Sequence, residues 1–120
     1  MTVPLYAIQW PLPLSPSEQD DFVFEGLGWI LETGEAIAAY ALTLGADAIA
    51  AGLTVGTGAF LPSQPSPTSI KFWFSIAAAH LADAAFAAPG VIVSMTLSIT
   101  TNNSPSRTRF RTLALQICQE

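Results

Sequence analysis

The sequence predicts an all-β fold, a small antiparallel β-sandwich that is immunoglobulin-like in outline and carries an extended N-terminal arm. Apolar and polar residues alternate with the two-residue period of strands, most clearly in the second half of the chain. About six or seven such segments are separated by Gly-, Pro- and Asn-containing turns. A length of 120 residues suits one domain. We place the arm at residues 1–19 and the sandwich at residues 20–120.

The arm is predicted from its prolines, which remove backbone donors and hold the chain extended. Four of them (Pro4, Pro11, Pro13 and Pro16) alternate with apolar residues. Tyr6 and Trp10 are candidate partner contacts, because aromatic residues are enriched in the cores of interfaces. The arm is expected to lie either on its own sandwich or on a neighbouring molecule.

The first half of the sandwich shows weaker strand patterns than the second. An aromatic strand is expected over 22–31 and another strand over 37–44, joined by a turn. Weak strand character follows over 48–55. Residues 56–69 are rich in Gly, Pro and Ser, which predicts a loop.

The second half shows clear alternation. In the strand over 70–76, Ile70, Phe72, Phe74 and Ile76 share one face. The alanine-rich stretch 77–88 is expected to cross between the sheets as a short helical turn or an ordered loop. A hairpin is then predicted over 91–117, with its turn at 101–106. Its last strand directs Leu113, Leu115 and Ile117 inward, and Arg109 and Arg111 continue that row beyond the core.

Composition excludes several classes of function. Charged residues make up 11% of the chain and apolar residues 51%, so extensive disorder is excluded. A net charge of −5 opposes binding to nucleic acid. The uncharged runs contain Gly, Pro, Ser or Asn, so no membrane insertion is expected, and no signal peptide is recognised. The excess of apolar over charged residues indicates surface that is buried against other chains.

Few residues are suited to catalysis or to cofactor binding. Cys118 is the single cysteine, so no intrachain disulfide or cysteine-based zinc site is expected. A small hydrolase would need the lone His80, for instance with Asp83, but no nucleophile motif accompanies it. Glu18, Asp20, Asp21 and Glu25 could hold calcium or form a solvated acidic surface. We therefore expect no enzyme, no metal and no cofactor.

Three of the four basic residues gather at the start of the last predicted strand. They are Arg107, Arg109 and Arg111, and their alternation places them on one face. They could pair with acidic residues of the same domain or with an acidic partner. They complete the set of candidate partner contacts.

The order of several motifs over about residues 20–118 resembles the phage fiber-tail adaptor proteins. These motifs include the aromatic segment ending Trp29-Ile30-Leu31, the run Ile70-Lys71-Phe72-Trp73-Phe74, and the ending 104–117 with its Arg-Thr pair and closing strand. The Gly-Gly turn usual after the central strand is absent here. The resemblance implies a structural protein of the bacteriophage virion, an adaptor that connects the tail to its fibers.

Membership would also imply a location and partners. The chain would form a homo-oligomeric ring in the tail or neck, contact other tail, neck or fiber proteins, and reside in the host cytoplasm before assembly. An alternative is a host-facing module of the virion that binds carbohydrate or a receptor through aromatic residues in its loops.

Overall fold

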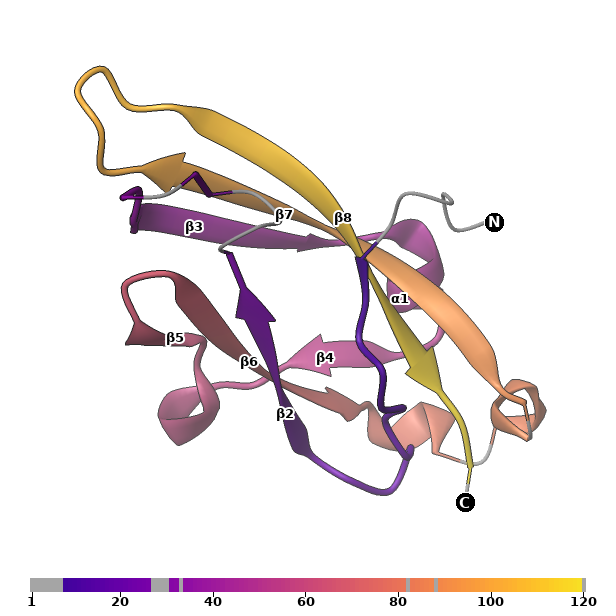
Figure 1. Ribbon diagram of the computed structural model, residues 1–120. Coiled ribbons are helices and arrows are strands. Elements are labelled where there is room, and N and C mark those ends of the chain that lie inside the picture. Colours follow the sequence, from indigo (N-terminus) through magenta and orange to yellow (C-terminus); the bar gives the residue numbers. More distant parts are fainter. Residues whose placement is uncertain (1–7, 27–30, 33, 82, 88, 120) are drawn as a thin grey trace.

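The computed structural model describes residues 8–119 except 27–30, 33, 82 and 88. These residues form two β-sheets packed face to face, so the predicted all-β sandwich is confirmed (Figure 1). The strands and the one α-helix are β1 (Ile8–Gln9), β2 (Asp20–Glu25), β3 (Ile37–Leu44), α1 (Ala46–Ala50), β4 (Leu53–Val55), β5 (Ser63–Ser66), β6 (Ser69–Ile76), β7 (Val91–Thr101) and β8 (Thr108–Ile117). Short 3-10 turns lie at Gly58–Phe60, Ala78–His80 and Ala84–Phe86.

Sheet A contains the strands β1, β8, β7 and β3 in that order. The antiparallel β7–β8 pair runs from Val91↔Ile117 to Thr100↔Thr108, which confirms the predicted hairpin. β3 pairs antiparallel with β7 on one side. On the other side β1 pairs with β8 in parallel, so the sheet is antiparallel apart from this short first strand.

Sheet B is arranged around β6, which was predicted over 70–76 and extends over Ser69–Ile76. β2 pairs along one side of β6 in antiparallel register, with Val23 opposite Lys71. On the other side β4 pairs with the C-terminal part of β6 and β5 with its N-terminal part. β5 is a strand inside the stretch that was expected to be a loop, so that expectation was wrong over Ser63–Ser66.

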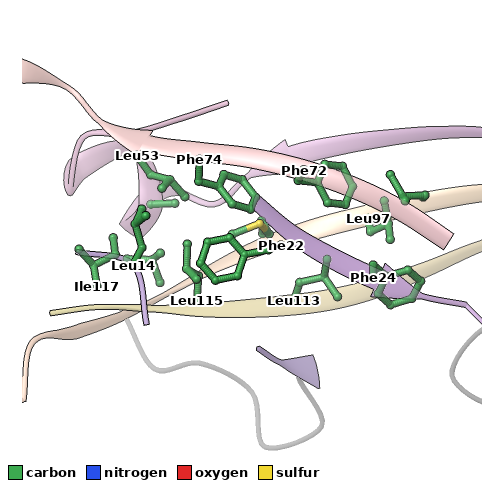
Figure 2. Packing of buried hydrophobic residues seen from close by; sticks show 14 of the residues in the cluster. Leu14, Phe22, Phe24, Leu53, Phe72, Phe74, Leu97, Leu113, Leu115 and Ile117 are labelled. Carbon is green, nitrogen blue, oxygen red and sulfur yellow. The ribbon is translucent and has the colours of Figure 1, made fainter. Parts of the chain in front are cut away.

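The core lies between the two sheets, where period-two alternation brings apolar side chains together (Figure 2). From sheet B come Ile70, Phe72, Phe74 and Ile76, each at most 6% exposed, as the alternation of β6 predicted. From sheet A come Val93, Met95, Leu97, Ile99, Leu113, Leu115 and Ile117. Phe72 and Phe74 stack on each other with ring centroids 6.0 Å apart.

The described part of the expected arm lies on its own sandwich. The Leu14 amide donates to the Gln116 carbonyl at 2.8 Å, and the Cys118 amide donates to the Leu14 carbonyl at 3.0 Å. The Leu14 side chain is fully buried beside Ile117 (Figure 2). Of the two positions expected for the arm, its own domain or a neighbour, residues 8–16 take the first.

The weak strand expected over 48–55 was wrong in its first part, where the chain forms α1. Asp47 explains the difference, because its carboxylate accepts hydrogen bonds from the Ala48 amide and from the amide and hydroxyl of Ser94. The alanines of α1 favour a helix, and Ala48 is fully buried. Gly52 follows with a φ of +85°, and the strand character begins only at Leu53.

Two further predictions concern the segments 22–31 and 77–88. The aromatic strand expected over 22–31 ends at Glu25, and residues 27–30 lie outside the described residues. The stretch 77–88 crosses from β6 in sheet B to β7 in sheet A through two 3-10 turns, as expected. It contributes Phe86, 1% exposed, to the core.

None of the described helices has the length and apolar content needed to cross a membrane.

Candidate interaction surfaces

Two of the three candidate arginines pair with acidic residues of the same chain. Arg109 Nη1 lies 2.8 Å from Glu35 Oε1, and Arg107 Nη1 lies 3.1 Å from Glu32 Oε2. The first pair is largely covered, with side-chain exposures of 19% and 4%, whereas the second is open to solvent at 54% and 68%. Of the two alternatives that the sequence left open for these arginines, pairing within the domain is present in both.

Glu35 is the buried charge at this cluster. Its Oε1 accepts a hydrogen bond from the Glu32 backbone amide at 2.8 Å as well as the bond from Arg109. The Glu32 amide, followed by Arg109, lowers the pKa of the Glu35 carboxyl below its ordinary value, although burial acts in the opposite direction. The Glu35 carboxylate therefore links the Glu32 backbone to Arg109 near the tip of the β7–β8 hairpin.

Arg111 lies on the same strand but contacts a different surface. Its Nη1 donates to the Phe110 carbonyl at 2.8 Å. Arg111, Phe110, Thr96 and Thr112 line a shallow depression on sheet A. Arg111 remains a candidate partner contact on this geometry.

Trp10 packs mainly inside its own chain. Its ring lies 5.5 Å from Phe22 and 5.7 Å from Phe74, measured between ring centroids, and its Nε1 donates to the Val23 carbonyl at 2.9 Å. Trp10 thus links the N-terminal segment to the free side of β2. The other aromatic candidate, Tyr6, lies outside the described residues.

On the outer face of sheet A, the residues of β3, β7 and β8 that the register directs outward are all uncharged, although Arg111 reaches this face beside Phe110 and the Asp47 carboxylate bonds to Ser94. The register places there Ala39, Ala41, Thr43, Ile92, Ser94, Thr96, Ser98, Thr100, Thr108, Phe110, Thr112, Ala114 and Gln116. Phe110 is 62% exposed and Ile92 is 43% exposed. The sequence pattern predicted a Ser/Thr face, but Phe110 was not among the predicted partner contacts. Its alternation with Arg109 and Arg111 is the signal that places it on the opposite face of the strand.

The outer face of sheet B is charged by comparison. The register places there Asp21, Val23, Glu25, Thr54, Lys71, Trp73 and Ser75. Lys71 Nζ lies 3.7 Å from Asp21 Oδ2 across the two strands. Charged groups keep a surface hydrated, so this face is suited to solvent, whereas the outer face of sheet A is suited to contact.

The residues considered for catalysis and for metal binding have structural contacts. His80 Nδ1 lies 2.8 Å from Asp83 Oδ2, and the His80 ring packs so closely on Gly52 that a Cβ there would lie 2.6 Å from it. Within the described part of the chain, no three His, Cys, Asp or Glu residues are grouped as metal ligands would be. The acidic residues at the start of β2 include Asp21, which pairs with Lys71.

Comparisons with protein-family models, with curated proteins and with solved structures gave no match to this chain.

Proposed function

We propose that this protein is a structural component of a bacteriophage virion, an oligomeric adaptor in the tail or neck that connects the tail to its fibers. The observation that carries the proposal is the outer face of sheet A, where the outward-directed residues of three strands are uncharged and Phe110 and Ile92 are exposed. The order of motifs that resembles the phage fiber-tail adaptors supplies the biological setting.

A flat, uncharged sheet face is suited to assembly for an energetic reason. Burying an ionised group that finds no partner costs several kcal/mol, so a surface without charges is covered at least cost. The face instead offers hydroxyl groups, which can bond to a partner, and an aromatic ring of the kind that anchors interfaces. The described N-terminal segment, Arg107 and Arg109 pack on their own chain, whereas Phe110 and Ile92 on this face are exposed.

The test is incorporation into tail particles. Phe110→Lys places a charge on the outer face of sheet A near the tip of the β7–β8 hairpin, and Val23→Lys places the same charge on the outer face of sheet B. Because an aromatic anchor contributes about 2 kcal/mol or more, Phe110→Lys is expected to reduce incorporation at least about tenfold. Val23→Lys is expected to incorporate normally. Particles purified to homogeneity that lack this chain, or equal incorporation of both variants, would overturn the proposal.

A host-facing module that binds carbohydrate or a receptor is the second candidate. Phe60, 39% exposed, packs edge-on against Trp73 with ring centroids 5.1 Å apart, and Leu61 beside it is 56% exposed. An aromatic pair with one exposed ring, next to a loop, is a surface that such a module would use. Binding of the isolated chain to a glycan array, lost in Phe60→Ala and retained in Phe110→Ala, would favour this function over the adaptor.

A further inference from the structure

β3 is an edge strand of sheet A whose free side is open. In the described part of the chain its one strand partner is β7. The Gly45 amide bonds to the Ser94 carbonyl, so the hydrogen-bonded pairs of this ladder fall on Thr43, Ala41 and Ala39. The backbone groups of Tyr40, Leu42 and Leu44 therefore point away from β7.

These edge-facing groups have no hydrogen-bond partner among the described residues. Only the start of the strand is covered, where the Ile37 amide donates to the Pro67 carbonyl at 2.8 Å and Gln64 Nε2 donates to the Ile37 carbonyl at 3.3 Å. From Ala39 onward β3 presents alternating donors and acceptors, which is the surface to which another strand adds.

The side chains of β3 also suit a further strand. Tyr40, Leu42 and Leu44 point inward and pack against the core, yet each is only partly buried. A strand added at this edge would cover their open flank with its own inward side chains. On the outer side stand only small residues, Ala39, Ala41 and Thr43, which would not obstruct pairing.

The other long edge of the sandwich is protected by comparison. β2 carries Asp20, Asp21 and Glu25, and charges on an edge strand oppose pairing with another chain. The Val23 carbonyl on its free side is already occupied by Trp10 Nε1. β3 carries no charge and no proline, and beyond Ile37 none of the described residues bonds to its free side.

The residue pattern of β3 and its lack of charge are compatible with a second copy as the occupant of this edge. Two copies of a chain with a net charge of −5 repel each other wherever acidic side chains meet. Two copies can approach each other along β3, because this strand carries no acidic side chain. When one copy of β3 is reversed against the other, small outer residues face small outer residues and larger inner residues face larger inner residues. A second copy of this chain is therefore the partner that the edge fits.

We infer that β3 pairs antiparallel with β3 of a second copy, across a two-fold axis perpendicular to the sheet at Ala41. Such an axis keeps the two cores on the same side of one continuous sheet. It places Ala41 opposite Ala41 of the second copy, Ala39 opposite Thr43, and Tyr40 opposite Leu42. This register pairs the strand from Ala38 to Leu44 and leaves the covered Ile37 outside.

The inference goes beyond the proposed function, since a two-fold contact joins copies in pairs and not head to tail around a ring, and the isolated chain tests it without a virion. A chain that dimerises through β3 and is absent from virions overturns only the proposed function. A chain that is present in virions and does not pair through β3 overturns only this inference.

Site-directed disulfides provide the test. In a Cys118→Ser background, Ala41→Cys is expected to form a disulfide-linked dimer under mild oxidation. Residues facing each other in a non-hydrogen-bonded antiparallel pair have Cα atoms about 4.5 Å apart, within disulfide reach. Val23→Cys, an equally accessible position on β2, is the matched control and is expected to remain monomeric. Equal cross-linking of the two variants would overturn the inference.

The register is tested by mixing two further variants in the same background. Ala39→Cys and Thr43→Cys chains are each expected to give little dimer alone and a heterodimer when mixed, because these residues face each other only across the two copies. In addition, Ala41→Lys is expected to convert a sedimenting dimer to a monomer, with thermal unfolding confirming that the variant is folded. A wild-type chain that sediments as a monomer at every concentration tested contradicts the pairing.

Discussion

At the base of the β7–β8 hairpin, Leu113, Leu115 and Ile117 face the core, and at its tip the same row continues as Arg109 and Arg111. The two ends share strands and face, but they are stabilised differently. At the base, side chains of sheet B cover the row (Figure 2). The tip extends beyond sheet B (Figure 1), and there Glu35 pairs with Arg109.

The difference shows how one strand can continue past the core that supports it. Near the tip, Glu32 pairs with Arg107 and Glu35 pairs with Arg109. The Ala36 amide also donates to Asn102 Oδ1, and the Asn102 amide donates to the Ala36 carbonyl. Apolar burial holds the base and polar contacts hold the tip, so the two ends should respond differently to mutation, pH and salt.

The largest effect is expected at the base. Leu115→Ala removes a fully buried side chain between the sheets and is expected to lower the free energy of unfolding by about 2–5 kcal/mol. The loss should be the same at low and at high salt, because no charge is involved. Urea unfolding of the isolated chain measures it. A loss below about 1 kcal/mol would show that the base is not held by burial.

An intermediate effect, and one that depends on pH, is expected at the covered pair of the tip. The folded-state pKa of Glu35 lies below its unfolded value, so its stabilisation is present above the unfolded value of about 4.5 and is lost as the pH falls through the folded value. Glu35→Gln removes this contribution. The urea midpoint of the variant should be lower than that of the wild type at about pH 7, and the two should converge in acid.

The control for that measurement is Glu18→Gln, at an exposed acidic residue far from the tip in sequence. It should leave the pH dependence of unfolding unchanged. A midpoint difference between Glu35→Gln and the wild type that stays constant from neutral to acidic pH would contradict the role assigned to the Glu35 charge.

The smallest effect is expected at the exposed pair. Arg107→Gln breaks the contact with Glu32, and exposed ion pairs contribute about 0–1 kcal/mol, less at high salt. The change in the free energy of unfolding should therefore be near zero in high salt. If Arg107→Gln lowered the free energy of unfolding as much as Leu115→Ala, the polar contacts of the tip would stabilise the fold as much as apolar burial does at the base.

Much of the fold could be predicted because period-two alternation is a local property. The β6 residues Ile70, Phe72, Phe74 and Ile76, and the β8 row from Leu113 to Ile117, alternate in the sequence and are buried in the structure. β3 was also predicted at its observed bounds. The helix α1 was missed because Asp47 is held by Ser94, a residue on a strand almost half the chain away.

The contact surfaces could be predicted less well than the fold. Tyr6 and Trp10 were chosen by residue type, and for Trp10 only the structure reveals Phe22 and Phe74 as its neighbours. Arg109 and Arg111 lie on β8 as predicted, whereas Arg107 precedes the strand. The acidic residues that pair with Arg107 and Arg109, Glu32 and Glu35, lie about 75 residues earlier in the chain. The open edge of β3 has no sequence signal of its own, since edge and central strands alternate alike.

By itself, the sequence determined the class of fold, the faces of its clearest strands and the low charge of its surface, because periodicity and composition are properties of neighbouring residues. The tertiary structure decided which acidic residues pair with Arg107 and Arg109, where the described N-terminal segment lies, which residues share a sheet face and which strand is left at an edge. These depend on distances between residues far apart in the chain, and such distances arise only when the two sheets pack.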